Sequence, residues 1–326
     1  MDNVRLMIAG TGSYLPEGVI RNDFFANRPL KIYDSSGSVI GEKVLSEEDI
    51  FNLGGIKERR RARENECPSD MGYKAALRAI ENAGIEVDSL KGIILASVSE
   101  DTNYPSGATK IQRMLGARNC LAYDFSAACA GFPEALAQAD ARNLRNPGNY
   151  LVVAAECLTR MMDNEDINSW IFGDGAGAAV LTPTNDLVGI LATYSRSDPF
   201  DGKDGWIFRD SGRILRMPEG RKVMKEAVRG MLDAASQVKK IAGWERADVY
   251  IPHQANLRIL QQVEDRVREE GAIVYKNIGD YGNMSSATCA VALDEARRKG
   301  IVKSGSKVVV VAFGSGLITS AAAIQF

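Results

Sequence analysis

Hydrophobic residues fall into short runs that alternate with amphipathic segments, and this pattern predicts an α/β protein. Runs such as 91–97 and 307–313 are apolar on both faces, as expected of strands in a sheet that helices cover on each side. The predicted strands are 4–9, 91–97, 120–125, 150–156, 175–182, 188–194, 248–251, 273–275 and 307–313. The predicted helices are 69–83, with Ser69 as N-cap, 108–115, 129–144, 220–241, 256–270 and 285–299.

A membrane span or an export signal would have to lie in the uncharged C-terminal stretch or in the segment that starts at Met1. Residues 308–326 carry no charge, but Gly314, Ser315 and Gly316 interrupt them. Two buried strands joined by a glycine turn explain this stretch better than a spanning helix. The segment that starts at Met1 lacks the long apolar core of a signal peptide. We therefore expect no membrane span and no signal peptide.

Two short motifs occur twice in the same order. Ser126–Ala130 is echoed by Ser286–Ala290, each at the head of a predicted helix, and Phe172–Gly175 is echoed by Phe313–Gly316. Small-residue strings can recur by chance, but two ordered echoes favour a duplication. We expect two similar α/β halves packed face to face in one body, because no Pro- or Ser-rich linker separates them.

Charge and cysteine content exclude several classes of protein. The 326 residues include 40 basic and 42 acidic side chains, a formal net charge of −2, which argues against a nucleic-acid partner held through its phosphates. An odd number of scattered cysteines without a CxxC pair disfavours a disulfide framework or a zinc site and indicates reduced thiols in the cytoplasm. The cysteines are Cys67, Cys120, Cys129, Cys157 and Cys289.

Three polar residues lie at predicted strand-to-helix turns. His253 is the only histidine, and it lies at a strand end, where sites in α/β sheets are assembled, although turn histidines also serve structure alone. Asn283, in Tyr281-Gly282-Asn283, is by itself only a turn signal. Cys129 precedes a long helix, whose dipole should lower the thiol pKa, although cysteine also fills space in cores.

The duplication predicts that these turns meet. If a pseudo-twofold axis relates the halves, Cys129, His253 and Asn283 converge at the interface between them. That arrangement supplies a nucleophile, a neutral imidazole and an amide donor, with no metal implied. Cys289 takes the place of Cys129 in the second half and is expected to be a space-filling residue.

Four motifs in this order resemble the thiolase superfamily and, within it, β-ketoacyl-acyl-carrier-protein synthase III. The likeness runs from about Gly55 to the C-terminus. It implies a five-layered αβαβα fold of two duplicated halves, 1–183 with the nucleophile and 184–326 with His253 and Asn283. The motifs are Ala127–Phe132, Phe172–Ala178, His253–Asn256 and Tyr281–Asn283; Gly55–Arg60 and Phe313–Gly316 also fit.

The resemblance implies a decarboxylative condensation. Cys129 takes an acyl group from a thioester, after which malonyl-acyl carrier protein binds and loses carbon dioxide. His253 Nε2 and the Asn283 amide donate hydrogen bonds to the thioester oxygen as the enolate forms. The backbone N–H groups of Cys129 and Ser315 hold the oxyanion when the carbanion attacks the acyl-cysteine. The product is a β-ketoacyl thioester that starts fatty-acid or polyketide-type synthesis, without a cofactor.

The resemblance also implies partners. Arg258 and Lys225 match positions at which the acidic carrier protein docks, although solvated helix charges explain them nearly as well. Tyr104 matches the place from which a partner subunit closes the acyl tunnel, which implies a homodimer. The basic run 59–63 is expected to be a solvated edge strand.

Some positions depart from the family pattern. Asp49 and Leu53 stand where family members that accept acyl-CoA place Trp and Arg to clasp the adenine, and a third nucleotide-binding Arg is replaced within 163–170. Coenzyme A binding is therefore expected to be weak, which favours a donor on a carrier protein. Residues 27–44 exceed the family minimum, and Ser315 stands where glycine is common.

Other activities fit part of the pattern. A papain-like cysteine hydrolase also uses Cys, His and Asn, but its nucleophile needs a Cys-Gly-Ser-Cys-Trp context that is absent. A degradative thiolase needs a second reactive cysteine, for which Cys289 is the only candidate. A relative that forms an ester or amide without decarboxylation, and a non-catalytic subunit, stay open as alternatives.

Overall fold

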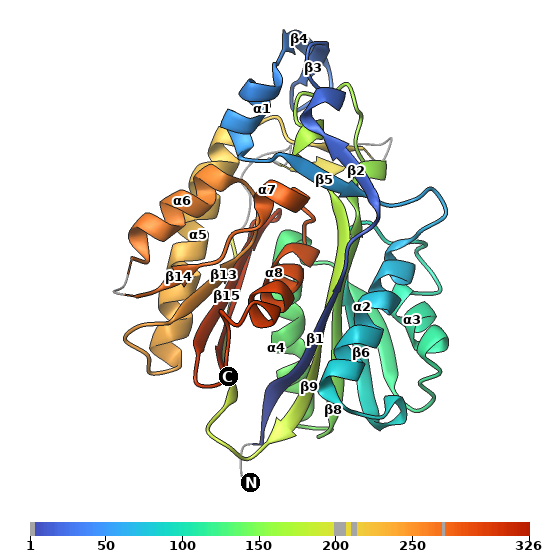
Figure 1. The fold of residues 1–326 in the computed structure, drawn as a ribbon, viewed down its shortest axis with the longest axis vertical. Helices are drawn as coiled ribbons and strands as arrows, with labels where there is room; N and C mark the ends of the chain where they lie inside the picture. The colour runs from blue at the N-terminus through green and yellow to red at the C-terminus, as the bar shows by residue number, and fades with distance from the viewer. Residues whose placement is uncertain (1–3, 199–206, 210–213, 269–270) are drawn as a thin grey trace.

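Two five-stranded mixed sheets form the frame of the protein (Figure 1). The structure, a computed structural model, describes residues 4–198, 207–209, 214–268 and 271–326. The first sheet has the order β1-β9-β8-β6-β7 and the second the order β10-β16-β15-β13-β14. Their bounds are β1 Arg5–Tyr14, β6 Leu90–Ala96, β7 Leu121–Phe125, β8 Asn149–Cys157 and β9 Asp174–Thr184, then β10 Gly189–Ser197, β13 Val249–Pro252, β14 Ile273–Val274, β15 Lys307–Gly314 and β16 Ile318–Gln325.

The two sheets repeat the same connectivity. In the first, β9 runs antiparallel to both β1 and β8, while β6 runs parallel to both β8 and β7. In the second, β16 is antiparallel to β10 and β15, and β13 is parallel to β15 and β14. The duplication inferred from the sequence echoes is therefore present in the strand topology. The division at residues 183 and 184 stays a prediction; it falls at the end of β9.

Six helices complete a five-layered αβαβα body. In Figure 1, α4 and α8 lie between the sheets, α2 and α3 cover the first sheet, and α5 and α6 cover the second. The predicted fold class is confirmed. The bounds are α2 Pro68–Ala83, α3 Gly107–Leu115, α4 Gly131–Asn143, α5 Gly220–Ile241, α6 Leu257–Arg266 and α8 Ala287–Arg298.

The strands that read as apolar on both faces are buried on both faces. Val308, Val309, Val310 and Val311 of β15 are fully buried, as expected for a strand between two helix layers. The uncharged C-terminal stretch forms β15 and β16, joined by a turn at Ser315–Leu317. Within the described ranges, every helix is too short or too polar to cross a bilayer.

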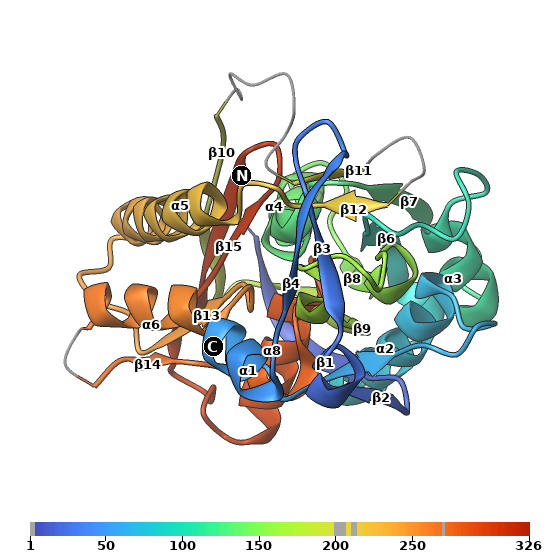
Figure 2. The ribbon, with the colours of Figure 1, turned by 90° about the horizontal axis from the view of Figure 1, so that it is seen from above.

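A cap of smaller elements lies over one end of the layers. Its helices and strands come mostly from the segment between β1 and α2, which the sequence pattern left unassigned. Figure 2 shows the hairpin β3–β4 reaching from α1 toward β11–β12. The bounds are β2 Gly18–Arg21, β3 Pro29–Tyr33, β4 Val39–Val44, α1 Glu47–Gly54, β5 Glu58–Arg61, β11 Phe208–Arg209, β12 Leu215–Arg216 and α7 Ile278–Tyr281.

Residues 27–44, which the sequence analysis expects to exceed the family minimum, contain the β3–β4 hairpin, which is anchored on the segment 163–167. The Tyr33 hydroxyl donates to Asp163 at 2.8 Å, and the Arg216 guanidinium lies 3.8 Å from the centre of the Tyr33 ring. Arg216 also pairs with Asp166 at 2.9 Å. Since an arginine can stack on an aromatic ring and bind carboxylates together, one side chain joins β3, β12 and the acidic segment.

Two local predictions were wrong. Ser69 does not cap α2, because the helix begins one residue earlier and Cys67 is its N-cap, with Asp70 accepting from the Cys67 N–H at 2.8 Å. The basic run 59–63 is not wholly solvated, because Arg59 is fully buried. Its guanidinium donates to Asn22 Oδ1 at 2.9 Å and to Trp170 O at 2.7 Å. Arg59 thus joins the cap to the segment that contains Trp170.

Candidate active site

A cavity of about 700 Å³ contains the residues that the sequence singled out. Cys129 of the first half and His253, Asn283 and Ser315 of the second all line it. Apolar residues of both halves also line it, among them Leu158, Met161, Ile171 and Phe172 from the first half and Val223, Met224, Ala227, Ile259, Phe313 and Ile318 from the second. The structure therefore brings the thiol, the imidazole and the carboxamide together in one largely apolar chamber.

The turn that carries Cys129 is built from small residues. β7 ends at Phe125, a 3-10 turn spans Ala128–Ala130, and α4 begins at Gly131. Ala128 takes a positive φ of 47°, a conformation that non-glycine residues rarely adopt and that clusters at functional sites. A Cβ on Gly131 would lie 2.8 Å from that of Ala96 and 3.0 Å from that of Ser286. Close packing of α4 against β6 and α8 therefore requires glycine there.

The thiol of Cys129 does not have the lowered pKa that its place before a helix predicts. The pKa of Cys129 is raised to about 11, mainly by burial; a hydrogen bond with the Ser285 side chain opposes this rise and the carboxyl of Glu156 adds to it. Desolvation disfavours the thiolate more than the helix start favours it. The thiol is therefore protonated at neutral pH.

His253 follows β13 and is 3% exposed. Its N–H donates to Val311 O at 2.8 Å, and its Nδ1 lies 2.6 Å from Thr288 Oγ1. Burial lowers the pKa of His253 to about 3, since desolvation disfavours an imidazolium and no anion among the described residues offsets it. The ring is neutral at neutral pH, as the sequence argument required.

Asn283 joins the second half to the first. Its N–H donates to Ile171 O at 2.9 Å and its carbonyl accepts from Gly173 N–H at 3.0 Å, which makes a bridge with Phe172. Its Oδ1 accepts from Ser285 N–H at 2.8 Å. This bond leaves the Nδ2 group as the donor that Asn283 can offer to a ligand.

The turn after β15 lies against the nucleophile turn. A Cβ on Gly314 would lie 2.8 Å from Cys129 N and 2.9 Å from Ala128 Cβ, so the two turns meet backbone to backbone. Ser315 follows directly, and its hydroxyl donates to Ile207 O at 2.5 Å. Ser315 is not among the residues with positive φ, so its side chain is accommodated without backbone strain.

The Phe172–Gly175 motif supports the cavity wall. Asp174 accepts from Ala62 N–H at 2.8 Å, from Thr159 N–H at 2.9 Å and from the Thr159 hydroxyl at 2.7 Å. A Cβ on Gly173 would lie 2.4 Å from Tyr281 O. The glycine thus permits the close approach at which Asn283 bridges to Phe172.

The sequence analysis missed a buried carboxyl group behind the nucleophile turn. Glu156 at the end of β8 is fully buried and accepts from the hydroxyls of Ser99 and Ser286, each at 2.6 Å, and from Val98 N–H at 3.0 Å. Burial raises the pKa of Glu156 against these hydrogen bonds. The available signal was an acidic residue inside the apolar run 150–157.

The structure places the predicted docking and tunnel residues outside the cavity lining. Lys225 on α5 and Arg258 on α6 are exposed, but Met224 and Ile259 beside them line the cavity. Tyr104 is 86% exposed, on a loop whose residue Glu100 lines the cavity. Among the residues that the structure describes, no group of three or more His, Cys, Asp and Glu side chains could hold a metal ion.

Cys289 lies in the first turn of α8, the central helix of the second half. It is fully buried, its thiol lies 3.8 Å from the carbonyl oxygens of Ile251 and Val311, and burial raises its pKa. The prediction that Cys289 fills space agrees with this position.

Comparisons with known proteins identify the family and agree with the fold. The family models for 3-oxoacyl-[acyl-carrier-protein] synthase III match residues 123–199 and, for its C-terminal part, residues 240–326. A β-ketoacyl-[acyl-carrier-protein] synthase III of Clostridioides difficile is 39% identical over 99% of both chains.

Solved structures give the same result. The crystal structure of 3-oxoacyl-[acyl-carrier-protein] synthase III from Aquifex aeolicus has a TM-score of 0.87 and 34% identity, covering 99% of this chain and 100% of that one. The priming β-ketosynthase of the R1128 polyketide pathway has a TM-score of 0.87 at 30% identity, covering 98% and 96%.

The fold and the chamber define a thiolase-like condensing enzyme, a transferase that joins acyl units. The thiol of Cys129, the imidazole of His253 and the amide of Asn283 lie in one cavity of this fold. Within the class, the chain belongs to the β-ketoacyl-acyl-carrier-protein synthase III family.

Proposed function

We propose that this chain joins an acyl thioester to malonyl-acyl carrier protein with loss of carbon dioxide, and that Cys129, His253 and Asn283 carry the reaction. The observation on which the proposal rests is that these three residues of separate halves line one cavity. The family to which the chain belongs, and a priming ketosynthase among its structural neighbours, support the same reaction. No cofactor takes part in this scheme.

The first step transfers the acyl group to Cys129. The sulfur attacks the thioester carbonyl, the bond to the donor's sulfur breaks, and the proton of the cysteine thiol leaves with the donor thiolate, so that a free thiol is released. The high pKa of Cys129, about 11, fits this order, because the thiol keeps its proton until the donor arrives.

The second step removes carbon dioxide from the malonyl thioester. The C–C bond to the carboxylate breaks and its electron pair forms an enolate, whose oxygen accepts hydrogen bonds from His253 Nε2 and Asn283 Nδ2. A neutral imidazole suits this role, because an imidazolium could protonate the enolate before it reacts. The lowered pKa of His253, about 3, keeps the ring neutral.

The third step forms the new carbon–carbon bond. The enolate carbon attacks the acyl-cysteine, and the tetrahedral oxyanion is held by the backbone N–H groups of Cys129 and Ser315. The contact of Gly314 with the Cys129 turn supports this pairing. Each such donor lowers the barrier by about 3 kcal/mol. Collapse of the intermediate expels the Cys129 thiolate, which takes up a proton from solvent, and yields the β-ketoacyl thioester.

We propose that the carrier protein docks across α5 and α6, beside Lys225 and Arg258. Both side chains are exposed, and among the described residues no ion pair occupies either of them. A basic surface at the cavity edge attracts an acidic partner. We also propose that the acyl donor is held on a carrier protein, because Asp49 is engaged with Ser46 in the capping box of α1 instead of offering a nucleotide contact.

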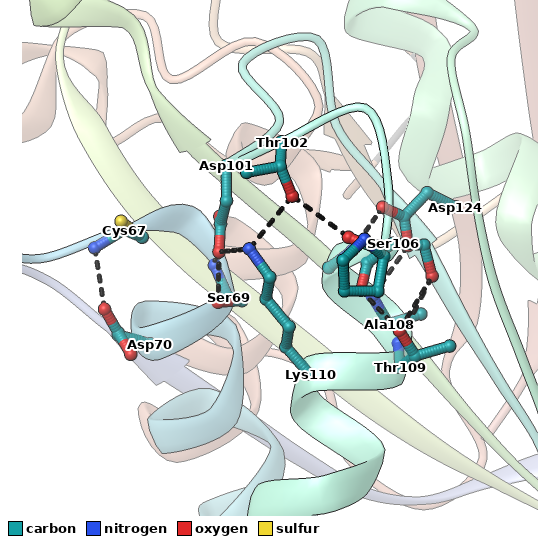
Figure 3. Close-up of polar contacts among 12 residues, drawn as sticks. Cys67, Ser69, Asp70, Asp101, Thr102, Ser106, Ala108, Thr109, Lys110 and Asp124 are labelled. Atoms are coloured by element: carbon teal, nitrogen blue, oxygen red, sulfur yellow. Dashed lines mark hydrogen bonds and ion pairs between the residues drawn. The ribbon is translucent and has the colours of Figure 1, made fainter.

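We propose that two copies form a dimer around Tyr104. Figure 3 shows how its loop is held: Asp101 accepts from the Ser69 hydroxyl at 2.5 Å and from Lys110 at 3.2 Å, and Asp124 accepts from Gly107 N–H at 2.6 Å. A loop anchored at its base while Tyr104 is 86% exposed is suited to contact a partner. The neighbouring strand β7 is an edge strand that a second copy can protect.

The experiment that tests the reaction follows the acylation step and the condensation step separately. Incubation with an acyl thioester should leave an acyl adduct on Cys129 by intact mass; Cys129→Ala should lack it, and Cys120→Ala should keep it. Addition of malonyl-carrier protein should then release carbon dioxide and a β-keto product. His253→Ala and Asn283→Ala should acylate but not decarboxylate. An adduct that passes to an alcohol or amine without release of carbon dioxide contradicts the proposal and identifies an ester- or amide-forming acyltransferase.

A further inference from the structure

The hydroxyl of Thr288 stands between two acceptors, and one of them is the imidazole of His253. Thr288 Oγ1 lies 2.6 Å from His253 Nδ1 and 2.9 Å from Ser285 O. Thr288 is fully buried and His253 is 3% exposed, so bulk water has little access to these groups. A hydroxyl has one proton, and it can serve only one of the two acceptors at a time.

The acceptor to which the Thr288 hydroxyl donates determines whether Nε2 of His253 is a hydrogen-bond donor or an acceptor toward the cavity. If Thr288 donates to Ser285 O, then Nδ1 must carry the ring proton to satisfy the short contact, and Nε2 is left as an acceptor. If Thr288 donates to Nδ1, the ring proton lies on Nε2, which becomes a donor. The tautomer of a neutral histidine is set in this way by the partner of its other nitrogen.

The surrounding hydrogen bonds favour donation to the ring. Ser285 O already accepts from the Thr288 N–H at 3.2 Å, so it keeps a partner when the hydroxyl turns away. Nδ1 has no other hydrogen-bond partner among the residues that the structure describes. A buried acceptor without a donor costs more than one hydrogen bond exchanged for another. The contact with Nδ1 is also the shorter of the two.

We propose that Thr288 is a positioning residue that fixes the neutral tautomer of His253 with its proton on Nε2. The inference rests on the proposed function only for its consequence, since a proton on Nε2 is what an enolate oxygen requires. Thr288 acts through the ring and touches no reacting atom. It lies in the first turn of α8, three residues after Ser285, whose φ of 46° turns the chain into that helix.

A side chain of the same shape without the hydroxyl separates this role from packing. Valine keeps the β-branch of threonine, whereas serine keeps the hydroxyl and loses only the methyl group. In Thr288→Val, Nδ1 loses its donor, and the ring proton can no longer be held on Nε2 by a partner. In Thr288→Ser the donor returns. A purely structural role predicts the opposite ranking, because the buried methyl group is lost only in serine.

The tautomer can be observed directly, because His253 is the only histidine of the chain. With ¹⁵N-labelled histidine, the untagged full-length protein should show one pair of imidazole nitrogens at pH 7. We expect Nδ1 to have the shift of an unprotonated, hydrogen-bonded nitrogen and Nε2 that of a protonated one. Protonated Nδ1 in the wild-type protein overturns the inference. This measurement needs no substrate, so it stands or fails independently of the condensation reaction.

The variants then connect the tautomer with activity. We expect Thr288→Val to change the two nitrogen shifts, to acylate Cys129 at the wild-type rate and to decarboxylate malonyl-carrier protein about tenfold or more slowly. Thr288→Ser should restore both the shifts and the rate. Unchanged shifts in a folded Thr288→Val protein, verified by its circular dichroism, refute the role of the hydroxyl. Wild-type decarboxylation by Thr288→Val with altered shifts refutes its consequence for the reaction.

Discussion

Gly314 and Cys129 are in backbone contact across the two halves: a Cβ atom on Gly314 would lie 2.8 Å from the Cys129 nitrogen. Real Cβ atoms do not approach so closely to a backbone atom, so a side chain at position 314 must push the nucleophile turn away. Because the Cys129 N–H is one of the proposed oxyanion donors, this contact is where a single methyl group should affect the chemistry.

We expect Gly314→Ala to slow the acylation of Cys129 about a hundredfold, the usual cost of losing one oxyanion donor. Gly220 offers a matched control, because it also lines the cavity but a Cβ there meets its nearest atom at 3.8 Å. Gly220→Ala should acylate normally. The measurement is the rate of adduct formation by intact mass, and equal rates for the two variants contradict the prediction.

The buried His253 should make stability depend on pH. Its pKa is lowered from 6.5 to about 3 in the folded protein, so between these values the unfolded chain binds the proton and the folded protein does not. Above pH 6.5 the ring is neutral in both states and does not affect the pH dependence. As the pH falls from 6.5 toward 3, the unfolding free energy decreases by about 1.4 kcal/mol per pH unit.

His253→Gln removes this group and should flatten that part of the curve. Urea unfolding of wild type and variant between pH 4 and pH 8 measures the difference, in which the shared contributions of carboxyl groups cancel. A difference in unfolding free energy that stays constant below pH 6.5 shows that the ring is accessible to protons in the folded state.

Reversal of the exposed charges at the cavity edge should weaken the binding of the carrier protein and leave the chemical steps unchanged. Lys225→Glu and Arg258→Glu place like charges against an acidic partner, so we expect the KM for malonyl-carrier protein to rise about tenfold. The kcat with malonyl-pantetheine, which lacks the protein, should not change. Lys240→Glu, exposed near the far end of α5, is the control, and a comparable KM increase there points to net charge instead of a local surface.

A charge at the tip of the Tyr104 loop should disrupt the proposed dimer. Tyr104 is 86% exposed and Leu187, in the turn between β9 and β10, is 82% exposed, so the two positions are equally open in the single chain. We expect Tyr104→Asp to shift the sedimentation coefficient toward that of one chain and Leu187→Asp to leave it unchanged. Indistinguishable sedimentation of Tyr104→Asp and wild type rejects the interface.

The layered core was predictable because its pattern is local. Residues 220–241 form α5 with the predicted bounds. The strands that are apolar on both faces lie in sheets that helices cover. The segment between β1 and α2 gave no such pattern: β4 carries the exposed apolar residues Val39 and Ile40. The β3–β4 hairpin is held by distant partners such as Arg216, and periodicity within one segment cannot show such contacts.

Some features of the site could also be predicted from local motifs, whereas others depend on tertiary packing. Cys129, His253 and Asn283 could be found because each lies at a turn with a distinctive motif, and the echo suggested that these turns meet. The pKa of Cys129 could not be predicted, because burial, which decides it, depends on packing. Glu156 and Thr288 were missed, since a lone acid in an apolar run and a threonine in a helix become informative only beside their partners.

Cys129 and Cys289 show how a duplicated fold can use the same sequence motif in two different ways. Both thiols follow a run of small residues at the head of a central helix, yet Cys289 is sealed among Ile251 and Val311 while Cys129 opens onto the chamber. Access of substrate therefore distinguishes the two cysteines: the one that faces the cavity can react, and the one in the core only packs.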